Sequence, residues 1–334
     1  MNLKITLKHI SDDTGFSQST ISRAIRGEGR ISVENRKKII ESAEKLGYKL
    51  PSNQGQLPEN FPTYIALITN FRTGEFYSSF FVGFQVAALN KETQISLFSV
   101  AEGKREAIDV ISECITMGYK GAIIFAPEFF VTDYRHILEN TPKDFPVISC
   151  SNIDNTLIDT VTFDAYQGAT LVAKHLHKQG YTKFGIIEGP TRMPESRFRT
   201  NGFSDYLVHI ANLKVNWRFQ GDYTLDAGSS AFSSFINQKE KPEAVFAAND
   251  AMAVGFMEKA RQHGFEIPKD VAVVGYDNLP ICETHFPTIS SVNTDYTRLG
   301  ENAIEAILSR LKQPIDQQGI VSLVPVSLIE RGSS

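Results

Sequence analysis

Five polar side chains near the N-terminus have the chemistry needed to contact a nucleic acid. They fall between residues 18 and 23 and are Gln18, Ser19, Thr20, Ser22 and Arg23. Such side chains form hydrogen bonds with base edges and phosphates. Around them, Leu7, Ile10, Ile21 and Ile25 follow helical spacing, which predicts two short helices packed on a small shared core. A helix, a tight turn and a second helix can place the start of the second helix in a DNA groove.

The turn between these two expected helices carries signals of its own. Gly15 stands where the first helix must stop, so we expect a positive φ there. Ser17 is expected to cap the second helix, because its hydroxyl can accept from an otherwise unpaired backbone amide. An ordinary amphipathic hairpin of helices has the same spacing, but the polar, acid-poor second helix favours DNA binding.

A third helix and a linker follow. Residues 31–47 carry apolar residues at helical spacing, including Ile39 and Ala43, and end at Gly47. Residues 51–62 are rich in Pro, Gly, Asn and Gln without any period, which predicts a linker. We therefore expect a three-helix, helix-turn-helix DNA-binding domain over residues 1–50 and a hinge or linker over 51–62.

The charge of the chain is unevenly distributed. The 334 residues carry a net charge of −4, which alone argues against a protein that binds nucleic acid. Residues 1–50, however, hold ten Lys or Arg against six Asp or Glu, whereas the remainder holds 24 against 32. A basic head on an acidic body fits a small DNA-facing domain joined to a larger domain with another task.

From residue 63 onwards, short apolar runs alternate with helical stretches. Strands are expected at 64–69, 95–100, 121–126 and 145–150 and, after the pattern restarts near residue 160, at 183–188, 243–247, 271–275 and 321–329. Helices are expected at 80–90, 105–117, 132–139, 166–179, 198–210, 227–236, 251–263 and 296–312. This alternation predicts an α/β fold with parallel sheets covered on both faces. Two such units in series predict two lobes with a ligand site in the cleft between them.

Catalytic and metal-binding patterns are missing from the sequence. It contains no GxxxxGK[ST], GxGxxG, HExxH or GxSxG motif. His175 and His177 are two residues apart on an expected helix and point to different faces, so they cannot share a metal. We therefore expect no enzyme, no cofactor and no metal site, although catalytic groups need not be neighbours in sequence.

The cysteines and the N-terminus indicate the compartment. Cys114, Cys150 and Cys282 are far apart, odd in number and outside any CxxC pair, which favours neither disulfides nor zinc. The N-terminus has no apolar signal region, and no apolar run approaches the roughly 18–20 residues that span a bilayer. We therefore expect a cytoplasmic protein.

The segment TLKHISDDTGFSQSTISRAIRG resembles the start signature of the LacI/GalR family of bacterial transcriptional regulators. Further motifs of that family follow in order along nearly the whole chain. They are Leu46-Gly47-Tyr48, Gly189-Pro190, Arg199-Thr200-Asn201-Gly202-Phe203, Asn249-Asp250 with Ala253 and Gly255, Gly275-Tyr276-Asp277-Asn278, Pro287-Thr288-Ile289 and Glu330-Arg331-Gly332-Ser333. Each motif is weak alone, but their order and spacing together are specific.

The resemblance implies an architecture and a set of DNA contacts. The body would be a periplasmic-binding-protein-like effector domain over 63–331, with one lobe at about 63–160 and 292–320 and the other at about 163–290 and 321–331. The implied DNA-binding residues are Thr6, Leu7, Gln18, Ser19, Thr20, Ser22, Arg23, Arg26, Arg30, Asn35, Tyr48 and Leu57. For Arg26 and Arg30, an ordinary solvated charge remains an alternative.

The resemblance also implies an effector pocket. Its implied residues are Phe76, Tyr77, Ser151, Phe163, Arg199, Tyr223, Asn249 and Asp277. This set suits a sugar, because an aromatic ring stacks on a sugar face and charged groups bind its hydroxyls. Phe76 and Phe163 are alternatively core residues, Tyr77 a lobe-surface residue and Asn249 a helix cap.

Two departures from the family pattern stand out. Gln54 and Gly55 replace the Ala and Arg of the usual hinge, although Leu57 keeps the place of the Leu that enters the minor groove. Gly55 and Pro58 disfavour an internal helix by about 1 and 3 kcal/mol. Ser151 stands where many sugar-binding members carry an acid. The chain also lacks an added leucine heptad helix, so a homodimer is implied rather than a tetramer.

The sequence as a whole predicts a ligand-responsive, sequence-specific DNA-binding regulator. We expect a repressor of sugar-utilisation genes that binds a pseudo-palindromic operator as a dimer. Activation, and co-repression instead of induction, remain open, as does a purine or sugar-phosphate effector. The rivals are a stand-alone sugar-binding protein, which leaves the basic head unexplained, and a hydrolase or isomerase, for which no nucleophile pattern is present.

Overall fold

A computed structural model of the chain describes residues 6–26, 33–48, 63–100, 106–151, 157–313 and 319–334. Its contacts divide the chain into two compact units, Met1–Phe61 and Pro62–Ser334. The expected linker at 51–62 lies outside the described residues. No helix among the described residues has both the length and the apolar character needed to cross a membrane.

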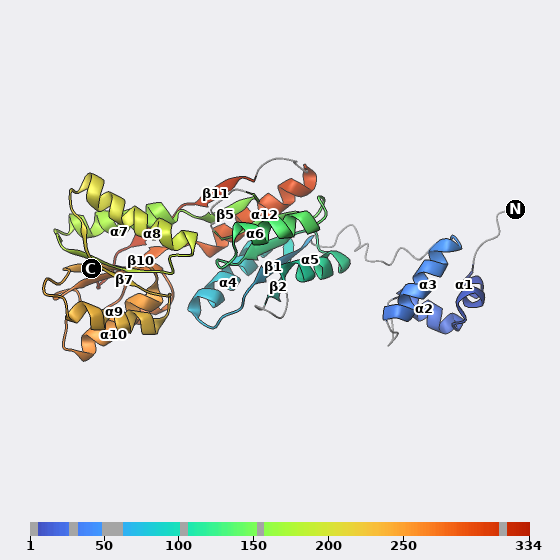
Figure 1. Ribbon diagram of the computed structural model, residues 1–334, viewed down its shortest axis with the longest axis horizontal. Helices are drawn as coiled ribbons and strands as arrows, with labels where there is room; N and C mark the ends of the chain where they lie inside the picture. The colour runs from blue at the N-terminus through green and yellow to red at the C-terminus, as the bar shows by residue number, and fades with distance from the viewer. Residues whose placement is uncertain (1–5, 27–32, 49–62, 101–105, 152–156, 314–318) are drawn as a thin grey trace. The chain divides into compact units, whose positions relative to one another are not determined.

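Three helices form the first unit, as expected. They are α1 (Leu7–Thr14), α2 (Gln18–Arg26) and α3 (Val33–Lys45), coloured blue in Figure 1. Ile10, Ile21 and Ile39 are completely buried between them. The helical spacing seen in the sequence therefore places one apolar residue from each helix in a common core, with Leu7 and Ile25 partly buried against it.

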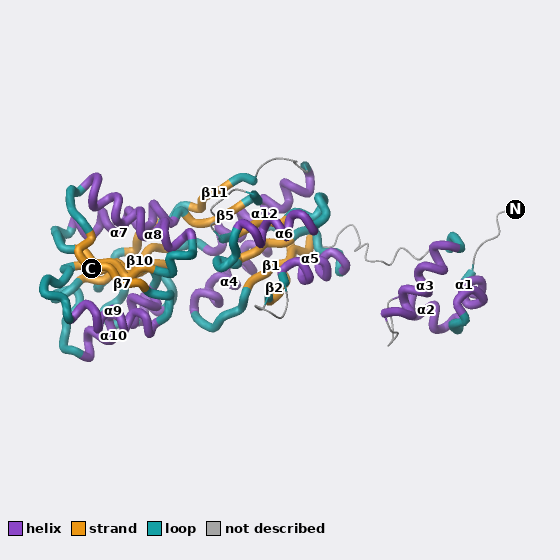
Figure 2. Tube along the Cα trace, in the orientation of Figure 1, coloured by secondary structure: helices purple, strands orange, loops and turns teal. Residues whose placement is uncertain are grey.

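Two six-stranded sheets form the second unit (Figure 2). The first has the order β11-β5-β4-β3-β1-β2 and the second β12-β10-β9-β8-β6-β7. The strands of the first sheet are β1 (Thr63–Thr69), β2 (Thr93–Ser99), β3 (Ala122–Phe125), β4 (Val147–Ser149), β5 (Thr160–Phe163) and β11 (Val321–Val324). Those of the second are β6 (Phe184–Glu188), β7 (Val215–Gln220), β8 (Ala244–Ala247), β9 (Ala272–Asp277), β10 (Ser290–Asn293) and β12 (Ser327–Ile329). All pairings between the described strands are parallel except β10 with β12, so the α/β fold with parallel sheets is confirmed.

Helices cover both faces of each sheet, which explains why the strands are almost continuously apolar. On the first sheet, α4 (Glu75–Asn90) and α12 (Tyr296–Lys312) pack on one face, and α5 (Ala107–Thr116) and α6 (Val131–Asn140) on the other. On the second, α7 (Ala165–Lys178) and α8 (Pro194–Asp205) lie on one face and α9 (Leu225–Ile236) and α10 (Asp250–Gln262) on the other (Figure 1). A short helix, α11 (Ile281–Thr284), follows β9.

The chain crosses between the sheets at its C-terminal end, where one expectation is wrong. The single strand expected at 321–329 is two strands in different sheets, so Val321–Val324 pairs within the first sheet rather than in the second lobe. Pro325 lies between them, and a proline cannot donate to a strand ladder. The strands β5, β7 and β10 are absent from the expected set, because their residues include too many polar side chains to form an apolar run.

The helix expected at 198–210 changes character along its length. The α-helix begins earlier, at Pro194, and ends at Asp205, and a π-helical turn, η1 (Tyr206–Ile210), completes the segment. Pro194 suits a helix start, because its missing N–H has no partner there in any case. The earlier start brings Glu195 into the first turn of α8.

Candidate functional site

The turn between α1 and α2 has the geometry that the sequence predicts. Gly15 has a φ of +75° and its N–H donates to the carbonyl of Ser11, which closes α1. The Ser17 hydroxyl accepts from the backbone N–H of Thr20 at 3.2 Å and so caps α2. Both expectations for the turn are confirmed.

The polar residues of α2 are available at the surface of the first unit. Gln18, Ser19 and Arg23 are exposed, and Thr20 and Ser22 are half-buried. The Arg23 Nε donates to the Ser19 carbonyl at 3.2 Å, so its side chain lies back along the start of the helix. This groups the guanidinium with the hydroxyls of the first turn, as a DNA-reading surface requires.

The other predicted DNA-binding residues fall into three groups. Thr6 is exposed before α1 and Asn35 is half-buried on α3. Leu7 and Tyr48 are partly buried against the three-helix core. Arg30 and Leu57 lie outside the described residues, as does the side chain of Arg26.

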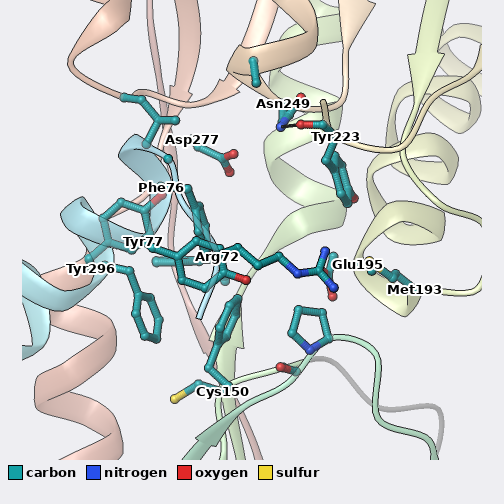
Figure 3. A pocket seen from close by; sticks show the side chains of 18 of the residues that line it. Arg72, Phe76, Tyr77, Cys150, Met193, Glu195, Tyr223, Asn249, Asp277 and Tyr296 are labelled. Carbon is teal, nitrogen blue, oxygen red and sulfur yellow. Dashed lines mark hydrogen bonds between the residues drawn. The ribbon is translucent and has the colours of Figure 1, made fainter. Parts of the chain in front are cut away.

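One cavity of about 310 Å³ lies within the second unit, and Figure 3 shows its walls. The structure brings all eight predicted effector residues into this lining, from elements of both sheets. They are Phe76, Tyr77, Ser151 and Phe163 from the first lobe and Arg199, Tyr223, Asn249 and Asp277 from the second. The cavity therefore lies between the lobes, where a ligand can contact both.

An ion pair between Arg199 and Asp277 stands at the second-lobe wall. Arg199 Nη2 lies 3.2 Å from Asp277 Oδ1, and the two side chains are only 11% and 6% exposed. Arg199 also donates to the Ala248 carbonyl and stacks over the Tyr276 ring, 3.8 Å from its centroid. Its Nε is buried without a hydrogen-bond partner. A buried guanidinium with a free N–H can donate to a bound hydroxyl or carbonyl oxygen.

Tyr223 provides an aromatic wall beside this pair. Its backbone has a φ of +72°, and its ring packs so closely on Gly189 that a Cβ there would come within 2.3 Å. Asn249 caps α10 by accepting from the Met252 N–H and donates to the Tyr223 carbonyl, each at 3.0 Å. The capping role considered for Asn249 is thus confirmed, and the same side chain holds Tyr223 in place.

Aromatic rings dominate the first-lobe wall. Phe76 contacts the rings of Tyr77, Phe125 and Tyr296. Phe76 and Phe163 are partly buried against the core of the first lobe and also line the cavity, so both of their proposed roles apply. The buried Ser151 hydroxyl accepts from the Ala126 N–H at 3.0 Å and ties the end of β3 to the segment after β4.

Several charged residues of the lining were missed in the sequence. They are Arg72, Glu75, Glu128, Glu195 and Asp222. Arg72, Glu128 and Asp222 each follow the carboxyl end of a strand, and that position was the available signal. Burial raises the pKa of Glu195 to about 7, against the opposing effect of Arg199. Burial likewise raises the pKa of Asp250 and of Asp277, although Arg199 opposes the shift at Asp277.

Asp250 stabilises the loop that presents Asp277. Its carboxylate accepts from the Leu279 N–H at 2.8 Å and from the Ser291 hydroxyl at 2.6 Å. It therefore fixes the turn after β9, where Asp277 and Asn278 both have positive φ. Within the described residues, no group of three or more His, Cys, Asp and Glu side chains is placed to hold a metal ion.

Known proteins match this chain at both units. Residues 6–51 match the bacterial regulatory proteins of the lacI family, and residues 173–334 match a periplasmic binding protein-like domain. The HTH-type transcriptional repressor PurR of Vibrio cholerae serotype O1 (strain M66-2) is 25% identical over 98% of this chain and 97% of its own length. The ribose operon repressor of Escherichia coli (strain K12) is 24% identical over 98% and 99%. The chain therefore carries a DNA-binding domain of the LacI family followed by a periplasmic-binding-protein-like domain.

Solved structures agree with this assignment at the level of the fold. The lac repressor dimer bound to operator and the anti-inducer ONPF has a TM-score of 0.73 at 22% identity, over 98% of both chains. The transcriptional regulator CelR in complex with cellobiose has a TM-score of 0.69 at 22% identity, over 99% of this chain and all of the other. With these two domains, the chain is a ligand-responsive, DNA-binding transcriptional regulator, and α1 to α3 form its DNA-binding part.

Proposed function

We propose that this regulator is a dimeric repressor whose binding to a pseudo-palindromic operator is controlled by a sugar-like molecule in the interlobe cavity. The observation that carries the proposal is the grouping of Arg199, Asp277 and Tyr223 in one cavity wall opposite Phe76 and Tyr77. A ring can stack on the aromatic faces while its hydroxyls bind the charged pair.

Control requires that the ligand binds one arrangement of the lobes more tightly than the other. Because both lobes contribute to the cavity, a ligand that contacts both walls favours the closed arrangement. A dimer then presents two DNA-binding heads to two half-sites. Two of its relatives, PurR and the ribose operon repressor, are repressors, which supports repression rather than activation. A protein that binds chromosomal DNA in a bacterium acts in the cytoplasm. Its proposed role involves binding only and no catalytic step.

A capture experiment with the full chain tests the proposal. Genomic fragments retained at moderate salt over excess competitor DNA identify the operator, and a thermal-shift screen of sugars, sugar phosphates and purines identifies the effector. A ligand present at 100 times its dissociation constant stabilises the folded protein by about 2.7 kcal/mol. The proposal predicts that a screen hit changes operator affinity; absence of any preferred fragment, with and without ligand, contradicts it.

A further inference from the structure

The charges of the cavity lining do not balance. Among the described lining residues there are five carboxylates and two guanidiniums, and neither Lys nor His is present. Four of the carboxylates already have partners. Glu75 accepts from the Ile281 N–H, Asp222 accepts from Thr224, and Asp277 pairs with Arg199. Glu128 accepts one bond from Asn70. This leaves Glu195, whose carboxylate accepts from its own backbone N–H.

Glu195 is the carboxylate whose surroundings suit a bound cation. It lies in the first turn of α8 and is half-buried. Its charge interacts with that of Arg199 on the same helix, whose ion pair is formed with Asp277 instead. Burial raises the pKa of both Tyr77 and Tyr223, and the negative charge of Glu195 adds to both shifts. All three side chains line the same cavity. A carboxylate beside aromatic rings is an environment that stabilises an ammonium group through charge and through the ring faces.

Arg72 indicates that a cation fits there. This exposed residue belongs to the loop between β1 and α4 in the first lobe, and its guanidinium points across the cavity towards Glu195 in Figure 3. It does not reach ion-pair distance. A ligand ammonium that binds Glu195 therefore competes with Arg72 for this carboxylate, because two cations close together repel each other.

The same charge balance disfavours anions. A phosphate or carboxylate on the ligand would lie against Glu128 and Glu195. Of the two arginines in the described lining, Arg199 is already neutralised by Asp277, so the exposed Arg72 faces both of these carboxylates. Like charges at short range in a partly desolvated site are strongly unfavourable.

We propose that the effector carries a protonated amine, as an amino sugar does, and that its ammonium group binds between Glu195 and the rings of Tyr77 and Tyr223. This inference rests on the proposed function only in taking the interlobe cavity as the effector site. It narrows the ligand class from sugars in general to cationic ones.

Matched ligand pairs test the inference with the full chain. Calorimetry measures the affinities of glucosamine, galactosamine and mannosamine against glucose, galactose and mannose, and against the 6-phosphates of the neutral sugars. We expect at least one amino sugar to bind tenfold or more tightly than its neutral partner, and the phosphates not to bind. Glu195→Gln should remove this preference, whereas Glu240→Gln, a change of equal charge at an exposed position of the second lobe, should retain it.

The outcomes separate this inference from the proposed function. Tighter binding of a neutral sugar or a phosphate, or no binding of any amino sugar, contradicts an effector with a protonated amine. The cavity would then bind an effector of another class. Amine binding that never alters operator affinity supports the inference and contradicts ligand control. If Glu195→Gln does not fold, Arg72→Gln is measured in its place. Loss of the competing guanidinium should raise the affinity for the amino sugar several-fold, and a lower affinity contradicts the inference.

Discussion

The carboxylate of Glu75 accepts a hydrogen bond from the backbone N–H of Ile281 at 3.0 Å, and this bond joins the two lobes at the rim of the cavity. Glu75 begins α4 on the first lobe, and Ile281 begins α11 on the second. The bond can form only while the lobes stay in this arrangement. A charged acceptor at a helix start is also favoured by the helix dipole.

Removal of this bond should favour separation of the lobes. We expect Glu75→Ala to weaken effector binding about three- to tenfold, because an exposed hydrogen bond to a charged group contributes on the order of 1 kcal/mol. Calorimetry measures the change. Glu75→Gln keeps an acceptor oxygen and should lose less affinity than Glu75→Ala, and equal losses in the two variants contradict the role of the bond.

Arg199 should be needed for the ligand response but not for DNA binding. Arg199→Ala removes the guanidinium that faces the cavity and leaves Asp277 buried without its partner, a change that costs about 3–5 kcal/mol of stability in comparable pairs. Operator titrations with and without effector should show retained DNA affinity and no effect of ligand. A thermal melt must first show that the variant is folded at the assay temperature, and loss of both properties in a folded protein contradicts the assignment.

Arg23 should be needed for DNA binding but not for effector binding. Its exposed side chain lies along the start of α2, where a contact with a base or phosphate contributes about 1–3 kcal/mol. Arg23→Ala should lower operator affinity by about tenfold or more and reduce its salt dependence, with effector binding unchanged. Arg261→Ala, at an exposed arginine on α10, is the matched control. Equal DNA affinity of the two variants contradicts a role for Arg23.

The sequence predicts the pocket residues that stand in family motifs, but not those that only the three-dimensional structure brings to the cavity. Arg199, Asn249 and Asp277 stand in family motifs, and the structure places them in one wall. Glu195 stands in no motif, and it reaches the cavity because α8 starts at Pro194, four residues before the expected helix. The strand β10, Ser290–Asn293, is polar because its hydroxyls bind Asp250, Arg331 and Ser334, so apolar periodicity could not reveal it.

The close contact between α4 and α12 should tolerate no added methyl group. A Cβ at Gly83 would come within 2.4 Å of the Tyr296 Cβ and 2.7 Å of its carbonyl carbon. Because backbone atoms cannot rotate away, Gly83→Ala should destabilise the protein by about 1–3 kcal/mol. Urea unfolding gives the free energy of unfolding. Gln85→Ala, an exposed change on the same helix, should stay within about 0.5 kcal/mol of the unchanged protein.

Glu195 should make stability fall as pH rises through the neutral range. Burial raises its folded pKa to about 7 from an ordinary value of 4.5, while Arg199 on the same helix opposes the shift and Asp277 and Glu128 add to it. Between these two pH values the folded state holds a proton that the unfolded state has lost, so the free energy of unfolding decreases with increasing pH. Asp250 and Asp277 contribute in the same direction. The difference in melting temperature between Glu195→Gln and the unchanged protein isolates the Glu195 contribution. It should grow in favour of the variant from pH 5 to pH 8, and a constant difference contradicts a raised pKa at Glu195.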